Sequence, residues 1–148
     1  MILLDAYAVI AYLQADAYAG DRVRDLIADA AVTSVNAAEV IDHLIRVHGA
    51  APGDAVLDVA QLGVEVIAVD DRIATRAGLL RAHHYHRRER PVSLADCIAA
   101  AASILVPEID AIATADPDLL DMLHEEGCSV HALPGSDGST WAPRDGEL

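Results

Sequence analysis

The chain has 148 residues, 53% of them hydrophobic, and a formal net charge of −14. This size predicts one domain, whose core must be built from Ala, Val, Leu and Ile because the chain has no Phe and only one Trp. Charged residues or His interrupt every apolar run, which argues against a membrane span, and the acidic balance argues against nucleic-acid binding through a general basic surface.

The N-terminal residues, MILLDAYAVIAYLQAD, make a poor signal peptide because they lack a basic region and carry Asp5 inside the apolar stretch. Cys97 and Cys128 lie far apart in apolar surroundings and are expected to be buried, reduced thiols. These features lead us to expect a cytoplasmic protein.

Short β-prone runs alternate with helical patterns along the chain. The expected strands are 2–4, 31–33, 64–69, 111–113 and 129–131. The expected helices are 6–14, 21–29, 36–48, 54–61, 71–84, 94–105 and 117–125, and several end at a following Gly or Pro. Strands that alternate with helices predict an α/β sandwich around a mostly parallel sheet.

The C-terminal stretch PGSDGSTWAPRDGEL has no periodicity and is rich in Gly, Ser and Pro. We therefore expect the compact domain to cover residues 1–133. Residues 134–148 are expected to form a loosely ordered tail, with Trp141 as the residue that docks back onto the domain.

Four acids are placed to meet at one edge of the sheet. Asp5 directly follows the first strand and Asp116 the fourth. Glu39 lies in the first turn of the helix after the second strand, and Asp96 opens the buried helix that leads into the fourth. Ligands of open parallel sheets bind outside the carboxyl ends of the strands. Clustered carboxylates repel one another unless a cation neutralises them, and ligands that are all oxygen favour Mg²⁺ or Mn²⁺.

Each acid, taken singly, has a simpler explanation in helix capping. Ser93 and Asp96 have the N-cap and N3 spacing, Asn36 and Glu39 form a similar pair, and Asp116 precedes a Pro. Asp70 also follows a strand and opens a helix without belonging to the proposed cluster. Capping alone would be served equally well by Ser, Thr or Asn, without mutual repulsion.

The order of these blocks resembles the PIN-domain ribonucleases, and most closely the VapC-type toxins of toxin–antitoxin pairs. The blocks are ILLD with Asp5, SVNAAEV with Glu39, SLADCIAAAA with Asp96, and TADPDL with Asp116, and the resemblance extends to Leu133. It implies a three-layer α/β/α sandwich with a five-stranded sheet in the order 3-2-1-4-5. Asp70 would then lie near the edge of the sheet, away from the cluster.

The resemblance also implies an activity, the Mg²⁺- or Mn²⁺-dependent hydrolysis of RNA phosphodiester bonds. Asp5, Asp96 and Asp116 are the implied metal ligands, and Glu39 completes the cluster. Supporting polar positions match Thr114 and Asn36. Many relatives carry a small hydroxyl residue just after the first Asp, whereas this chain has Ala6 and Tyr7 there. A hydrogen bond to Asp5 is therefore either missing or supplied by the Tyr7 hydroxyl.

RNA binding needs positive charge, and the only basic cluster is HHYHRRERP at 83–91. Arg87, Arg88 and Arg90 are candidate RNA contacts, with Tyr85 able to stack on a base. The simpler explanation is a solvated helix end whose cations complement the helix dipole.

The resemblance further implies a cognate antitoxin and a homodimer. The antitoxin would lie on the first two helices, for which the candidate contacts are Val9, Ile10, Leu13, Leu26 and Ile27; ordinary core residues are the alternative. Two other functions compete with a nuclease. A haloacid-dehalogenase-type phosphatase would want a second Asp at the position of Tyr7, and a degenerate PIN module would bind RNA or a protein without cleavage.

Overall fold

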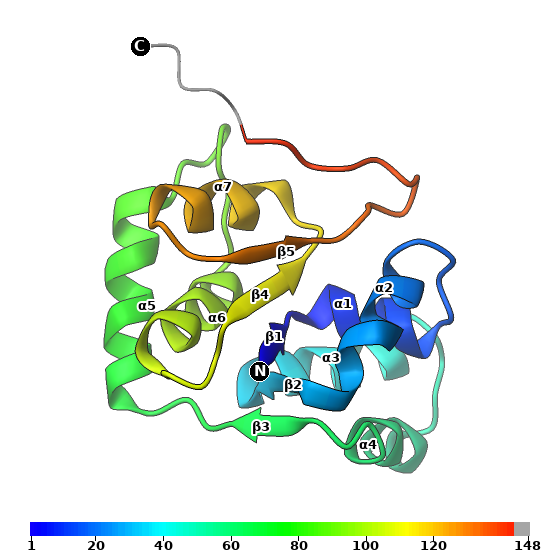
Figure 1. Ribbon diagram of the computed structural model, residues 1–148. Helices are drawn as coiled ribbons and strands as arrows, with labels where there is room; N and C mark the ends of the chain where they lie inside the picture. Colours follow the sequence, from blue (N-terminus) through cyan, green and yellow to red (C-terminus); the bar gives the residue numbers. More distant parts are fainter. Residues whose placement is uncertain (144–148) are drawn as a thin grey trace.

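The computed structural model describes residues 1–143, in which strands and helices alternate along the chain (Figure 1). The strands are β1 Ile2–Leu4, β2 Ala30–Thr33, β3 Glu65–Ile67, β4 Ala111–Thr114 and β5 Val130–Ala132. The helices are α1 Ala6–Leu13, α2 Ala19–Leu26, α3 Ser34–Arg46, α4 Pro52–Ala60, α5 Asp71–His84, α6 Leu94–Leu105 and α7 Pro117–Glu125, with a short 3-10 turn at Ile27–Asp29. The predicted α/β order is confirmed; the part of the expected tail at 144–148 lies outside the described residues.

The sheet has five parallel strands in the order β3-β2-β1-β4-β5, which confirms the topology that the family resemblance implied. In β1, Ile2 pairs with Ala30 of β2 on one side and with Ala111 of β4 on the other. The strand order reverses at β1 and β4, so the carboxyl ends of these two strands flank the crevice in which such sheets bind ligands.

Helices cover both faces of the sheet and make it a three-layer sandwich. Successive strand residues point to opposite faces. Leu3 belongs to the core beneath α5, α6 and α7, and Leu4 to the core beneath α1 and α3. Figure 1 shows these two groups of helices on either side of the strands.

The helix α6 forms as its sequence predicts and packs through small side chains. Its residues from Cys97 to Ala102 are all buried, and Ser93 caps its start by accepting the N–H of Asp96 at 3.0 Å. Methyl groups let this helix lie close to α5 and to the sheet. The Cys97 thiol is buried and free, as expected, whereas the free Cys128 is only partly buried.

The second helix and the third strand differ in their bounds from the ranges expected from the sequence, and local contacts explain both differences. The second helix begins at Ala19, since Asp16 Oδ1 accepts the N–H groups of Tyr18 and Ala19 at 2.8 Å each. The third strand is shorter than 64–69 because β3 lies at the sheet edge and pairs with β2 alone. Among the described residues no helix is long and apolar enough to cross a membrane.

Candidate metal-dependent nuclease site

Asp5 is buried at the end of β1, where it also caps α1. Its Oδ1 accepts the N–H of Ala8 at 2.8 Å, and its Oδ2 accepts a hydrogen bond from the Thr114 hydroxyl. Burial raises the pKa of Asp5 to about 6, against these two hydrogen bonds, and the charges of Asp116 and Glu39 add to the rise. Asp5 therefore does cap the helix, but the residue is only 3% exposed and its carboxylate is repelled by two other acids.

Asp96 lies in the first turn of α6, and its carboxyl group is not the cap. Ser93 provides the cap, so Asp96 is the N3 residue predicted from the sequence. Burial, the charges of Asp116 and Asp5, and a hydrogen bond to Asp116 together raise the pKa of Asp96 to about 7, against a hydrogen bond to Ser93 that lowers it. Because Ser93 already caps the helix, the cap does not require a partly buried carboxylate among other acids.

Asp116 follows β4 and caps α7, with its Oδ1 accepting the N–H of Asp118 at 2.8 Å. Its own N–H donates to Thr114 Oγ1 at 3.1 Å. Thr114 thus accepts from the backbone of Asp116 and donates to the carboxylate of Asp5, which joins the carboxyl ends of β1 and β4. Asp5 therefore receives a hydroxyl hydrogen bond from Thr114, which the sequence had singled out as a supporting residue.

Glu39 projects from α3 and is held by Asn36, whose Nδ2 donates to Glu39 Oε2 at 2.7 Å. The prediction that Asn36 caps this helix is wrong. The cap is Thr33, whose Oγ1 accepts the N–H of Asn36 at 3.0 Å, so α3 starts earlier than predicted. Buried Asn36 lies one turn inside the helix and positions the Glu39 carboxylate.

The structure brings Asp5 within electrostatic reach of Asp116, Glu39 and Asp96. The charge of Asp116 also acts on Asp96. Asp70, the comparison case, caps α5 through the N–H of Ile73 at 2.9 Å and follows the edge strand β3. Burial and neighbouring negative charge raise the pKa values of Asp5 and Asp96, which separates these two acids from an exposed residue that only caps.

A hard divalent cation fits this donor set by its chemistry. Every side-chain donor is a carboxylate oxygen, and the pKa values of Asp5 and Asp96 are raised, as expected for carboxylates that lack a counter-charge. Within residues 1–143, no three side chains of His, Cys, Asp or Glu stand at the spacing of a ready-made metal cage.

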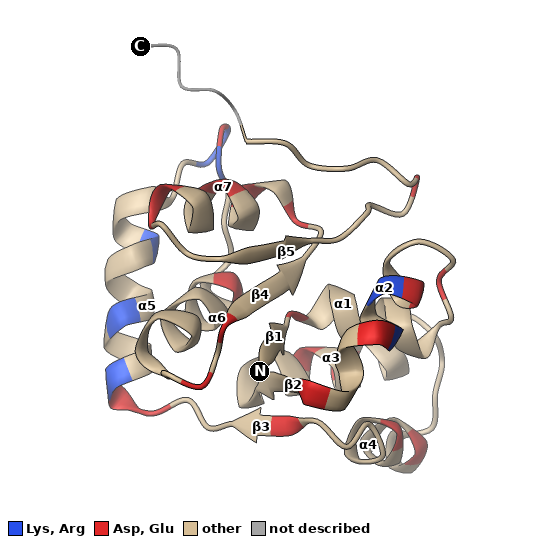
Figure 2. Cartoon of the chain, viewed as in Figure 1, with Lys and Arg blue, Asp and Glu red and all other residues tan. Residues whose placement is uncertain are grey.

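Of the three candidate RNA-binding arginines, Arg90 already has partners. Both terminal nitrogens of its guanidinium group donate to the Glu125 carboxylate, and the Nη1 bond is 3.0 Å long. Arg90 Nη1 also lies 3.0 Å from His84 Nδ1. Arg87 and Arg88 are exposed in the turn between His86 and Arg90. Figure 2 shows how few basic residues the described chain carries. The turn is attached to the C-terminal end of α7, whereas Asp116 caps the N-terminal end.

The expected antitoxin contacts divide into core and partly buried residues. Val9 is 1% exposed, so it is core and unavailable to a partner. Ile10, Leu13, Leu26 and Ile27 are partly buried against the same core. Leu26 also lines a groove of about 400 Å³ between α2 and residues 130–133 of the β5 edge.

The sequence did not indicate that the C-terminal segment, defined here as residues 134–143, would form part of this site. Gly135 and Ser136 line a pocket of about 240 Å³ together with Tyr7, Ala115 and Asp116. The expected docking of Trp141 is confirmed, since its Nε1 donates to Asp121 Oδ1 at 2.9 Å.

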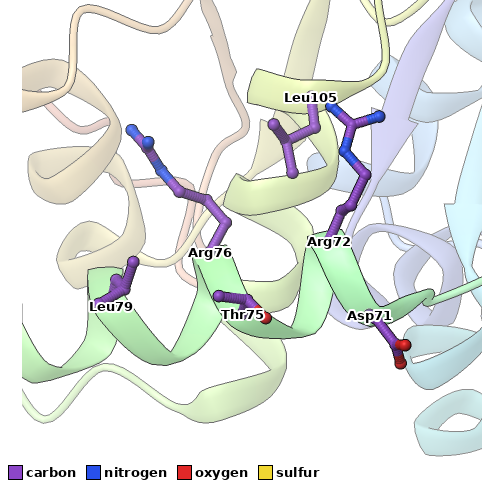
Figure 3. Close-up of a pocket in the computed structure, with 6 residues that line it drawn as sticks. All are labelled: Asp71, Arg72, Thr75, Arg76, Leu79 and Leu105. Atoms are coloured by element: carbon purple, nitrogen blue, oxygen red, sulfur yellow. The ribbon is translucent and has the colours of Figure 1, made fainter.

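A separate hollow of about 390 Å³ lies between α5 and the end of α6 (Figure 3). Arg72 and Arg76 flank Leu105 there. None of the four acids lines it, so it is distinct from the carboxylate site.

Comparison with known proteins places the chain in a family. The model of the PIN domain matches residues 2–123, and no curated protein matches. VapC20 of Mycobacterium tuberculosis, a sarcin–ricin loop cleaving toxin, is similar in structure at a TM-score of 0.62 and 20% identity, over 81% of this chain and 93% of that one. VapBC2 of Rickettsia felis, solved with a DNA fragment from its promoter, is similar at a TM-score of 0.65 and 14% identity, over 90% of this chain and 99% of that one. FitAcB of Neisseria gonorrhoeae is similar at a TM-score of 0.60 and 16% identity, over 88% of this chain and 96% of that one. Because the family model covers most of the chain, this protein belongs to the PIN domain family.

Proposed function

We propose that the chain is a Mg²⁺- or Mn²⁺-dependent endoribonuclease. Membership of the PIN family supports nuclease activity in general. The observation that carries the specific proposal is the electrostatic coupling of Asp5, Asp96 and Asp116 across the carboxyl ends of β1 and β4. Capping accounts for Asp5 and Asp116, whereas the helix of Asp96 is already capped by Ser93, so the start of that helix does not explain a buried carboxylate beside Asp116.

In this proposal Asp5, Asp96 and Asp116 hold the metal, and Glu39 completes the cluster by orienting the attacking water. A bound divalent ion lowers the pKa of water and neutralises charge on the phosphate. Thr114 fixes the rotamer of Asp5, and Asn36 does the same for Glu39. Arg87 and Arg88 are the remaining candidate RNA contacts, because Arg90 is paired with Glu125.

The proposal extends to the biological setting, a cytoplasmic toxin held by a cognate antitoxin. VapBC2 and FitAcB, which share the fold, support an antitoxin partner. The groove between α2 and the β5 edge supplies a surface for such a partner, and the net charge of −14 suits a basic segment. A homodimer is part of the same proposal, and size-exclusion chromatography with light scattering would test it.

The alternative is a degenerate PIN module that binds RNA or a protein without cutting. It is favoured by the lack of a ready-made three-ligand cage in the described part of the chain. Both functions predict a stable fold, so metal-dependent cleavage is the property that separates them.

The test is an RNase assay on the full chain, purified free of any antitoxin, with Mn²⁺, Mg²⁺ or EDTA. Cleavage should require the metal, and Asp96→Asn should lower the rate by about a hundredfold or more. The matched control is Asp70→Asn, which makes the same chemical change at a capping Asp outside the cluster and should cleave at the wild-type rate. Cleavage that survives EDTA, or an Asp96→Asn protein as active as wild type, would contradict the proposal.

A further inference from the structure

The pocket of about 240 Å³ beside Asp116 has walls from three separate parts of the chain. Tyr7 comes from the first turn of α1, and Ala115 and Asp116 come from the turn between β4 and α7. Gly135 and Ser136 of the C-terminal segment complete the wall. Since Asp116 belongs to the carboxylate cluster, whatever occupies this pocket lies next to the proposed reaction centre.

The wall from the C-terminal segment is a compact turn with its own hydrogen bonds. The segment leaves the sheet at Leu133, whose N–H donates to Thr114 O at 2.8 Å. Gly135 N–H donates to Ser139 O at 2.8 Å, and Gly138 N–H donates to Gly135 O at 2.9 Å. Ser139 N–H closes the turn on Asp137 Oδ1 at 2.9 Å. These bonds fix the position of Ser136 at the pocket.

Two anchors hold this turn against the domain. Gly138, at φ 81°, approaches Tyr18 of the α1–α2 loop so closely that a Cβ there would lie 2.9 Å from the ring. Trp141 is fixed on α7 through Asp121 and lies with its ring 6.1 Å from that of His124. Figure 1 shows the segment running from β5 toward the α1–α2 loop and back over α7. The wall is therefore part of the folded domain.

The size and chemistry of the pocket suit one flat, polar ring. At about 240 Å³ it is smaller than the roughly 300–1,000 Å³ pockets that take drug-sized ligands. Tyr7 and Ser136 both line it, so an aromatic side chain of the kind that stacks on bases and a hydroxyl side chain stand at the same small pocket. A base stacked inside a duplex cannot enter such a pocket without first leaving the stack.

We infer that this pocket holds one unstacked nucleobase next to the cleaved phosphate, with Tyr7 and Ser136 as its specificity-determining residues. The inference rests on the proposed nuclease function and adds to it the place where the base next to the cleaved phosphate is held. The C-terminal segment, which lies beyond the matched family region, then contributes to base specificity.

The test fills the pocket without touching the acids. Ser136→Tyr puts a ring into the space meant for the base, whereas Thr140→Tyr makes a similar change at an exposed position of the same segment. Cleavage with Mn²⁺ is compared on a hairpin with an unpaired loop and on the duplex of that loop with its complement. Ser136→Tyr should lower kcat/KM on the hairpin at least about tenfold, the size of one base-stacking contact, and Thr140→Tyr should match wild type. Unchanged emission of Trp141, the only tryptophan, would show that the segment still docks.

Binding is measured separately by fluorescence anisotropy with a labelled hairpin in the Asp96→Asn background. Adding Ser136→Tyr to this variant should weaken binding about tenfold. A wild-type protein that cleaves no RNA refutes the nuclease proposal, and the binding comparison then still decides on the pocket. A protein that cleaves duplex and loop equally, or a Ser136→Tyr variant that cleaves and binds like its parent, refutes the base pocket alone.

Discussion

At the scale of single residues, the site is built from groups that serve the fold and the chemistry together. Asp5 and Asp116 cap helices, while Thr114 connects the two by donating to one and accepting from the other. Asp96 differs, because Ser93 already caps its helix. The energetic cost of burying Asp5 and Asp96, which raises the pKa of both carboxyl groups, is the clearest sign of a function beyond capping.

The metal-free protein should lose stability as the pH rises from about 4 to about 7. The pKa values of Asp5 and Asp96, about 6 and about 7, exceed the usual 3.8, so the folded state holds more protons than the unfolded state in this range. The free energy of unfolding then falls with pH, by about 2 kcal/mol or more. Urea unfolding in EDTA at pH 5 and pH 8 measures it, and Asp96→Asn should show a smaller decline. Stability that rises over this range would contradict the expectation.

Removing the Thr114 hydroxyl should disturb both neighbouring acids. Thr114→Val keeps the shape but takes a donor from Asp5 and an acceptor from the N–H of Asp116, which should cost about 1–3 kcal/mol of unfolding free energy. The pKa of Asp5 should rise above about 6, as measured by NMR titration. The control is Thr75→Val on the exposed face of α5, which should change neither quantity. A Thr114→Val protein with the wild-type Asp5 titration would show that this hydrogen bond does not hold the carboxylate.

At the scale of elements, the positions of Glu39 and Asp96 depend on where α3 and α6 begin, and a specific cap sets the start of each helix. Thr33 starts α3 so that Asn36 and Glu39 lie one turn apart on the side of Asp5. Small buried side chains let α6 lie against α5 and the sheet, which carries Asp96 toward β1 and β4. The position of each acid thus depends on how closely its helix packs.

Enlarging the packed face of α6 should destabilise the domain and displace Asp96. Ala101→Leu adds side-chain volume at a position that is 0% exposed, and overpacking of this kind costs about 1–3 kcal/mol. Ala74→Leu, on the exposed side of α5, should change the stability by less than about 0.5 kcal/mol. Thermal and urea unfolding of both variants would measure the difference. Equal stability of the two variants would mean that α6 does not pack as tightly as described.

At the scale of the whole molecule, parallel β1 and β4 and the C-terminal segment bring distant parts of the chain together. The hydrogen bond between Thr114 and Asp5 spans 109 positions of sequence. Trp141 attaches the C-terminal segment to α7, so the last described residues enclose a pocket that begins at Tyr7. The site therefore depends on the complete fold.

Trp141→Ala should release the C-terminal segment while the sheet remains folded. Limited proteolysis should cut the variant after residue 133 much faster than wild type, and the free energy of unfolding should fall by only about 1 kcal/mol. Trp141→Phe, which keeps a ring beside His124 but loses the bond to Asp121, should give an intermediate cutting rate. Identical cutting of all three proteins would show that Trp141 does not anchor the segment.

The sequence determined most of the element order, because helix caps and apolar periodicity act over a few residues. The bounds of α5, α6 and α7 follow directly from it, and so do the positions of the four acids in the chain. The misplaced cap at Asn36 shows the limit, since Thr33 and Asn36 are both plausible caps by residue type and only the backbone path separates them. The sheet order came from the family resemblance rather than from any local pattern.

Only the tertiary structure decided which residues meet. Val9 is core rather than partner surface, Arg90 is paired with Glu125, and Ser136 lines the same pocket as Tyr7. These outcomes depend on contacts between residues far apart in the chain, and their energies come from packing and burial that no short stretch of sequence encodes. For the same reason, the sequence supplied four acids, and the fold placed Asp5 and Asp96 where burial and neighbouring carboxylates raise their pKa values, a cost that a divalent ion would relieve.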